Sequence, residues 1–361
     1  MPFRIEPRRD ASRAMLIAMP LLAVTLTVAA GFVLFAVMGY DPLAALYHFF
    51  VSPVLSVYGL AELGIKATPL VLCAVGLAIA FRANVWNIGA EGQLTIGAIA
   101  GGGVALWLWN ESGLLVLPLM GLAGALGGMA WAAIPALLKT RFNVNEILSS
   151  LMLTYVATLL LSTLVHGPWR SPDGYNFPET RLFSDSALLP VVLAGTRLHL
   201  GAVFALLAVS AAWLIMGRTI IGFQAKVVGQ APAAARFAGF SQKRIVWLTM
   251  LTSGGLAGLA GLFEVAGPVG QLVPVISPGY GFTAIIVAFL GRLHPAGVLF
   301  AGLLVALSYI GGENAQIEVG LPVAVTGVFQ GMLLFFLLGC DVLVRYKIRF
   351  APEPRRAVVR T

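Results

Sequence analysis

Long apolar runs alternate with short polar connections along almost the whole chain. Most of these runs approach the length of about 20 residues that a helix needs to cross a bilayer core about 30 Å thick. The pattern predicts an all-α polytopic membrane protein with about ten transmembrane helices. We place these helices at residues 15–38, 57–80, 93–109, 114–138, 146–166, 200–216, 245–267, 280–291, 295–312 and 321–344.

Two of the predicted spans are unusual. The eighth, residues 280–291, is short for a full crossing. The second, residues 57–80, contains Glu62 and Lys66, whose i, i+4 spacing would let them neutralise each other on one helix face.

Composition supports a membrane protein over a soluble one. Of the 361 residues, 59% are apolar and 11% are charged, whereas about a quarter of the residues in soluble chains are charged. Lipid must therefore cover much of the surface. The two cysteines, Cys73 and Cys340, lie in apolar runs and have no metal-binding or disulfide spacing.

The basic residues predict the orientation of the spans. If the N-terminus is cytoplasmic, ten spans return the C-terminus to the same side, and all but four of the 23 Lys and Arg residues then lie at the cytoplasmic face. The four exceptions are Lys66 in a span and Arg170, Arg181 and Arg197 in one outer loop. The net charge of +8 is thus a topology signal, and no basic surface with interleaved aromatics suggests nucleic-acid binding.

This topology divides the chain into three regions. Residues 1–14 form a cytoplasmic N-terminal leader, residues 15–344 a transmembrane domain, and residues 345–361 a cytoplasmic tail. Two loops of the transmembrane domain are long, the outer loop at 167–199 and the cytoplasmic loop at 217–244.

A polar segment interrupts the apolar pattern between the second and third spans. Gly89 and Gly92 permit backbone conformations that other residues resist, and backbone groups freed at membrane depth need internal partners or a water-filled cavity. Four polar side chains of a translocation path or gate are expected here: Asn84, Asn87, Glu91 and Gln93. Arg82 is the candidate partner of Glu91. An ordinary cytoplasmic turn with a surface ion pair is the alternative.

The cytoplasmic loop at 217–244 predicts a short helix parallel to the membrane. Pro232 suits the first helical turn, Gly239 is placed to end the helix in a left-handed conformation, and Ser241 can cap the next span. Phe237 and Phe240 are then exposed apolar side chains that could enter a groove on a soluble partner. Alternatively they fold back onto the membrane interface.

At these two places the sequence resembles the permeases of ATP-binding-cassette (ABC) importers. Residues 233–239 keep the Ala-Ala-x-x-x-Gly spacing of the family's coupling loop, with Ala233 where a Glu is usual. Residues 87–93, Asn-Ile-Gly-Ala-Glu-Gly-Gln, are similar to the signature of the nucleoside and simple-sugar branch, while ribose permeases carry a different motif there. The chain is thus similar to permeases for ribose-type sugars, branched-chain amino acids and nucleosides, whose architecture resembles that of the vitamin B12 importer (type II).

The resemblance implies a transmembrane permease subunit in the cytoplasmic membrane that translocates nucleosides or simple sugars. Its implied partners are a cytoplasmic ATPase that binds ATP and Mg, a second homologous permease, an extracytoplasmic substrate-binding protein, and membrane lipid. The residues implied in ATPase coupling are Gly229, Ala234, Ala235, Arg236, Phe237, Gly239 and Phe240. No catalytic residue, metal or cofactor is expected in this chain, and the sequence has no Gly-x-x-x-x-Gly-Lys-[Ser/Thr] loop.

Two other classes compete with this interpretation. A stand-alone secondary transporter would need charged residues near the membrane midplane for ion coupling, and only Glu62, Lys66 and Glu264 qualify. A membrane-embedded enzyme would need metal ligands or a nucleophile with a base. The histidines are dispersed at predicted membrane edges: His48, His166, His199 and His294.

Overall fold

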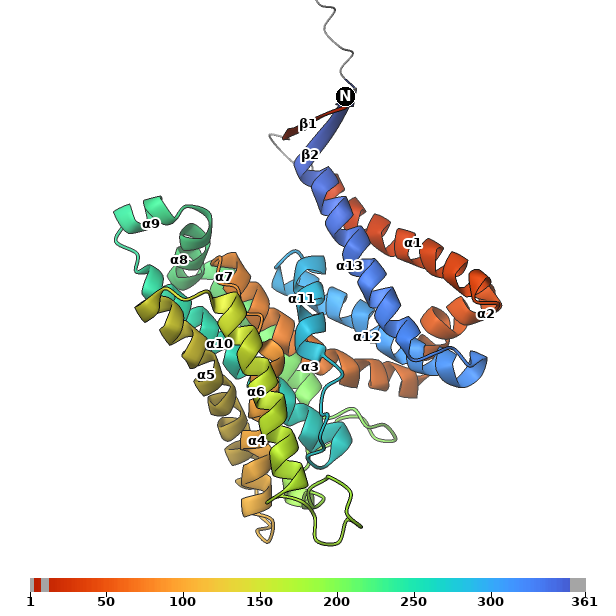
Figure 1. Ribbon diagram of the computed structural model, residues 1–361, viewed down its shortest axis with the longest axis vertical. Helices are drawn as coiled ribbons and strands as arrows, with labels where there is room; N and C mark the ends of the chain where they lie inside the picture. The colour runs from red at the N-terminus through yellow and green to blue at the C-terminus, as the bar shows by residue number, and fades with distance from the viewer. Residues whose placement is uncertain (1–2, 8–12, 351–361) are drawn as a thin grey trace, which may run out of the picture. The chain divides into compact units, whose positions relative to one another are not determined.

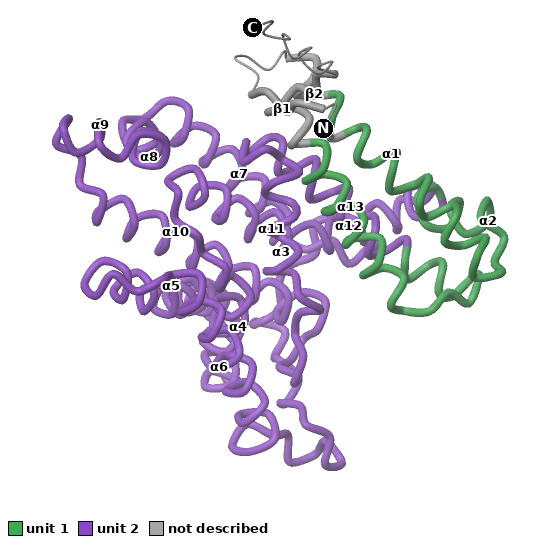
Figure 2. Tube along the Cα trace, turned by 45° about the horizontal axis from the view of Figure 1, so that its top comes forward, with its two compact units in different colours: residues 1–51, 312–361 green, residues 52–311 purple. Residues whose placement is uncertain are grey.

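The computed structural model describes residues 3–7 and 13–350 of the chain (Figure 1). The predicted leader, 1–14, and the predicted tail, 345–361, lie partly outside the described residues. The chain forms two compact units, Ser52–Gly311 and the combination of Met1–Val51 with Gly312–Thr361 (Figure 2).

The larger unit is a helical bundle. Its α-helices are α3 (Val57–Arg82), α4 (Ala90–Trp107), α5 (Val116–Phe142), α6 (Glu146–His166), α7 (Gly201–Arg218), α8 (Ile220–Gln230), α9 (Pro232–Phe237), α10 (Gln242–Glu264), α11 (Tyr280–Leu290) and the first part of α12 (Pro295–Val319). Shorter helical turns are η2 (Ser52–Val54), η3 (Asp185–Ala187) and η4 (Val265–Val269).

Side-chain caps determine where several of these helices begin. Ser56 accepts a hydrogen bond from the Gly59 amide at the start of α3, and Asn145 accepts one from the Ile147 amide at the start of α6. Such caps satisfy amides that have no partner inside their helix. Helices α5 and α6 are separate because Asn143 ends α5 in the left-handed conformation, with φ 54°, and Asn145 then caps the start of α6.

Helices α4, α5 and α10 pack closely through glycines. A Cβ atom on Gly258 of α10 would overlap the carbonyl oxygen of Gly124 on α5, and one on Gly97 of α4 would overlap the backbone of Gly258. Gly128 and Gly254 meet in the same way. Small residues let membrane helices approach to backbone contact, and these glycines allow α4, α5 and α10 to do so.

The helices of the larger unit differ in how far the chain itself covers them. Of the most apolar stretch of each helix, 78% is buried inside the chain in α3 and 67% in α10, but only 22% in each of α5, α6 and α7. Helices α3 and α10 are therefore central. The other three present apolar side chains outward, as lipid-facing helices do.

The smaller unit brings the two ends of the chain together. It contains β1 (Phe3–Pro7), α1 (Arg13–Val37), α2 (Pro42–Leu46), η1 (Tyr47–Val51), the end of α12, α13 (Ala324–Arg345) and β2 (Tyr346–Phe350). Its core includes three stacked rings, with Phe329 lying 5.5 Å from Phe35 and 4.5 Å from Phe49 between ring centroids. Strands β1 and β2 pair antiparallel, with Phe3 opposite Phe350, a small sheet that the apolar pattern did not predict.

The predicted all-α class is confirmed, since each of the predicted spans coincides with a helix. Six helices among the described residues are long and apolar enough to cross a membrane, namely α3, α5, α6, α7, α10 continued into η4, and α12. Glu62 of α3 forms a bidentate ion pair with Arg197, at 2.9 Å to Nε and 2.7 Å to Nη2, a partner that local spacing did not indicate.

Candidate functional site

The polar segment between α3 and α4 is a true break between two helices. Helix α3 ends at Arg82, Asn84 adopts a left-handed conformation with φ 55°, and residues 85–89 belong to no helix or strand before α4 begins at Ala90. Burial alternates from residue to residue along residues 84–89, so the segment has two sides. Its protein-facing side consists of the buried residues Val85, Asn87 and Gly89. On its accessible side lie Asn84, which is exposed, and Trp86 and Ile88, which are half-buried.

Asn87 and Gln93 form a reciprocal amide pair on the buried side. The Asn87 amide nitrogen donates to the Gln93 oxygen at 2.8 Å, and the Gln93 nitrogen donates back to the Asn87 oxygen at 3.0 Å. Asn87 also donates to the Ser253 hydroxyl at 2.9 Å and accepts from the Gly89 amide at 3.1 Å. Asn87 thereby uses its full hydrogen-bonding capacity. The pair ties the break to α4 and α10.

Helix α6 supplies partners for the backbone of the break. The Trp86 amide donates to the Glu146 carboxylate at 3.3 Å, and the Ile88 amide donates to the Ser150 hydroxyl at 3.2 Å. Residues 146 and 150 stand about one turn apart on α6, so one face of this helix meets the amides of two alternate residues of the break. The carboxylate of Glu146 is also paired with Lys139 at the end of α5. The amides of Trp86 and Ile88, which pair with no helix or strand, are thus satisfied by side chains of α6.

Glu91 caps another helix. Its carboxylate accepts a hydrogen bond from the Gly281 amide at 2.6 Å, in the first turn of α11. Ser277, Gly279 and Phe282 also face this carboxylate, and the Gly279 amide itself donates to the Ser277 hydroxyl at 3.1 Å. First-turn amides have no partner within their own helix, and the N-terminal end of a helix favours negative charge. Glu91 therefore joins the start of α4 to the start of α11.

The predicted ion pair between Glu91 and Arg82 is wrong. The Glu91 carboxylate is directed at the first turn of α11, where it accepts the Gly281 amide at 2.6 Å, and no ion pair between Arg82 and Glu91 occurs among the described residues. Gly281 packs directly against the backbone of Glu91 instead, where a Cβ atom would overlap it.

An aromatic cluster lies at the accessible side of the break. The ring of Trp86 lies 5.1 Å from that of Phe81 and 6.2 Å from that of Phe289, and Phe81 and Phe289 are 5.4 Å apart. The Trp86 indole N–H donates to the Asn84 side-chain oxygen at 3.0 Å. Sequence reasoning did not select Trp86 as a site residue. The position of Trp86 between Asn84 and Asn87 could have indicated that it belongs to the site. Nothing in the sequence near Phe289, which lies on α11, indicates that its ring joins this cluster.

The cytoplasmic loop contains the predicted short helix. Pro232 opens α9, and its end is a Schellman motif in which the Gly239 amide donates to the Arg236 carbonyl and the Phe240 amide to the Ala235 carbonyl, at 3.1 and 2.9 Å. Gly239 has φ 76°, which a side chain would disfavour. Ser241 caps α10. A second helix, α8, precedes α9 and was not predicted.

The predicted coupling residues divide into an outer and an inner set. Ala234, Arg236 and Gly239 are exposed, and Phe237 is 99% exposed. Ala235 is buried. The expectation that Phe240 is exposed is wrong, because it is half-buried against the same apolar cluster as Ala235 and its ring packs edge-on to that of Phe223.

The inner set, Ala235 and Phe240, connects α9 to the break through an apolar cluster. One apolar cluster contains Ala235 of α9, Val228 of α8, Ile245 of α10 and Val85 of the break. Gly229 of α8 packs so closely on the end of α3 that a Cβ atom would overlap the Arg82 carbonyl oxygen. Helix α9 is therefore linked to the break by continuous packing.

Comparison with known proteins assigns the chain to a family. It belongs to the branched-chain amino acid transport system / permease component family (BPD_transp_2), which matches residues 59–338. The ABC-permease resemblance found in the sequence is thereby confirmed, and the stand-alone transporter and enzyme alternatives lose their support.

Three relatives show the range of described substrates. The glucose ABC transporter permease protein TsgB13 of Haloferax volcanii is 37% identical, over 98% of this chain and 95% of its own length. The guanosine ABC transporter permease protein NupP of Bacillus subtilis is 32% identical, over 92% and 94% respectively. The nucleoside ABC transporter permease protein NupB of Lactococcus lactis is 28% identical, over 89% and 90%.

Proposed function

We propose that this chain forms the membrane path of an ABC importer for nucleosides, and that α9 is the element through which a separate ATPase drives it. The observation that carries this proposal is the contrast within α9. Phe237 is 99% exposed while Ala235, two residues earlier, is buried. On one side α9 packs on the protein through Ala235, and on the other it exposes the large apolar side chain of Phe237. Such a helix is suited to dock in a groove of a soluble partner.

The apolar cluster beneath α9 supports the mechanical part of the proposal. Helix α9 alone is far too short to be stable in water, so its position depends on Ala235 and on the flanking Phe240. When the ATPase pair closes on ATP, α9 moves with it and shifts Val85 and the end of α3 through the cluster. The break then opens or closes the path, which gives alternating access.

The four predicted path residues take different roles in this mechanism. Asn87, Glu91 and Gln93 are buried and bonded within the chain, so they position the break and α11. Asn84 is the member of the set that is exposed, and together with the half-buried Trp86 it would meet the passing solute.

A neutral, hydroxyl-rich solute suits these groups. An aromatic face can stack on a nucleobase, and the Asn84 amide can bond to hydroxyl or ring-nitrogen groups. The relatives NupP and NupB are named for guanosine and nucleosides, which supports a nucleoside. A simple sugar is the second candidate, favoured by the name of the glucose permease relative.

The proposal includes the assembly and its orientation. Both termini are cytoplasmic, the transmembrane domain covers residues 15–344, and the loop at 217–244 receives the ATPase. The outer loop at 167–199 faces a binding protein that delivers the solute, and a second, related permease completes the pore. ATP and Mg are bound by the ATPase.

Purification and uptake test this function. Purification in mild detergent from native membranes is expected to recover an ATPase and a second permease with this chain. Uptake by the reconstituted complex and its binding protein should require ATP, and excess guanosine should block uptake of labelled nucleoside. Preferential uptake of glucose would select the sugar alternative. Uptake by this chain alone, without ATP, would contradict the proposal.

A further inference from the structure

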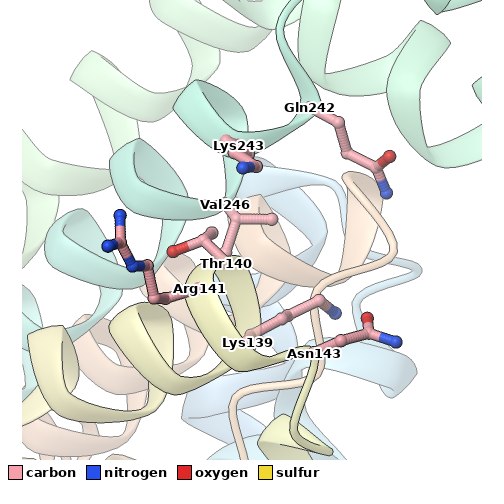
Figure 3. A pocket seen from close by; sticks show the side chains of 7 residues that line it. All are labelled: Lys139, Thr140, Arg141, Asn143, Gln242, Lys243 and Val246. Carbon is pink, nitrogen blue, oxygen red and sulfur yellow. The ribbon is translucent and has the colours of Figure 1, made fainter.

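A basic pocket opens between the end of α5 and the start of α10 (Figure 3). Its volume is about 220 Å³. Figure 3 shows the side chains around it: Lys139, Thr140, Arg141 and Asn143 from the end of α5 and its cap, and Gln242 and Lys243 from the first turn of α10. The proposed docking and gating residues do not line this pocket.

The pocket carries positive charge that the chain does not neutralise. Lys139 is paired with Glu146, but no acidic side chain in the described part of the chain pairs with Arg141 or Lys243. In Figure 3 Arg141 points to one side of the pocket and the side-chain amides of Asn143 and Gln242 point to the other, with Lys243 between them in the view. All four side chains are hydrogen-bond donors. Such a set fits an anion with several oxygen acceptors, above all a phosphate group.

An apolar stripe on α5 leads to this pocket. Its members lie on one helix face, at successive spacings of three, four, eight and three residues, and are between 37% and 58% exposed: Leu119, Leu122, Leu126, Ile134 and Leu137. Arg141 continues the same face one turn beyond Leu137. Helix α5 is also one of the helices whose apolar stretch is only 22% buried, so the stripe is open to acyl chains.

We propose that the pocket binds an anionic phospholipid, with the headgroup phosphate between Arg141 and Lys243 and an acyl chain along the α5 stripe. The positive charges of Arg141 and Lys243 favour an anionic ligand. The adjoining apolar stripe on α5 favours a ligand with an acyl chain over a soluble ion. The site does not depend on the proposed transport function. Since α10 follows directly on α9, the bound lipid lies at the base of the coupling helix.

Native mass spectrometry of the full chain in mild detergent tests the site. The delipidated protein is titrated with phosphatidylglycerol or phosphatidylcholine and the retained lipid is counted. Wild type should retain phosphatidylglycerol preferentially, and Arg141→Gln with Lys243→Gln should weaken retention about thirtyfold, since each of the two basic residues near a membrane surface contributes roughly 1 kcal/mol. Arg141→Lys with Lys243→Arg should keep it.

A matched control removes two other exposed cations, Lys226→Gln with Arg218→Gln, and should leave lipid retention unchanged. Equal loss in this control, or no loss in the pocket variant, would overturn the proposal. Binding of inorganic phosphate that depends on Arg141 and Lys243, with phosphatidylglycerol retention unaffected by them, would assign the pocket to a soluble anion. Unchanged lipid retention with reduced ATPase co-purification would make the pocket a protein interface, which also contradicts the proposal.

Discussion

Glu91 shows how one side chain can join two interrupted helices. It begins α4, yet its bonds are to the first turn of α11, almost two hundred residues further along the chain. The sequence indicated that an acid in this position needs a partner. It did not indicate which one, because the partner is a set of backbone amides and no residue type marks them.

Replacement of Glu91 by Gln should destabilise the start of α11. Gln keeps one acceptor oxygen, but its NH₂ group faces amide donors and the negative charge is lost. We expect a loss of about 1–3 kcal/mol in unfolding free energy and faster hydrogen exchange at the amides of residues 279–282. Thermal unfolding in detergent and exchange mass spectrometry measure these effects. Glu111→Gln, at an exposed acid, is the control; equal stability of the two variants would show that the capping bond contributes nothing.

His199 should make the stability of the protein depend on pH. Its ring is 3% exposed, its Nδ1 accepts the Gly201 amide at 3.2 Å, and burial lowers its pKa from 6.5 to about 4. Between these values the unfolded chain binds a proton that the folded chain does not, so stability is full above pH 6.5 and is lost as the pH falls toward 4.

We therefore expect the unfolding free energy to fall by about 1 kcal/mol from pH 7.5 to pH 5.5 through this group, because one pKa unit corresponds to about 1.4 kcal/mol. His199→Asn offers an acceptor oxygen in place of Nδ1 and should flatten that part of the profile. Chemical unfolding at the two pH values measures the difference between variant and wild type. The same pH dependence in both proteins would rule out His199 as its source.

At the scale of elements, most helices were predictable because their causes are local. Short stretches of sequence determine the apolar helices, the polar break, and the start of α9 at Pro232 and its end at Gly239. The elements that escaped prediction depend on distant partners. Strand β1 exists only as the partner of β2, and Phe240 turns inward because Phe223 and the cluster around Ala235 lie beneath it.

The glycine contact between α5 and α10 should be sensitive to a single added carbon. In Gly258→Ala the new Cβ overlaps the backbone oxygen of Gly124, which cannot rotate away, so we expect a cost of about 1–3 kcal/mol from overpacking. Gly121→Ala on α5 meets nothing within 4 Å and should change stability by less than about 0.5 kcal/mol. Melting temperatures in the same detergent make the comparison, and equal values would contradict close packing at Gly258.

At the scale of the whole molecule, α3 and α10 form the covered centre of the larger unit, and α5, α6 and α7 present apolar faces outward. Two features of this unit carry the proposed function: the break after α3, and helix α9, which packs on the protein through Ala235. The sequence indicated each of them separately. It could not indicate that they share one apolar cluster, because Val85, Val228, Ala235 and Ile245 come from four segments with no local relation.

The central claim is that α9 receives the drive from an ATPase through Phe237. The most direct measurement is co-purification of the ATPase with Phe237→Asp, compared with wild type and with Phe177→Asp. Phe177 is 65% exposed in the predicted outer loop, so this control places the same change on the opposite proposed face. Burying a phenylalanine is worth about 1.5–3 kcal/mol, and an Asp in its place would face an apolar groove.

We predict that Phe237→Asp reduces ATPase recovery more than tenfold while membrane insertion and the melting temperature stay at wild-type values, and that Phe177→Asp recovers the ATPase normally. Normal recovery with Phe237→Asp, or equal loss in both variants, would contradict the account.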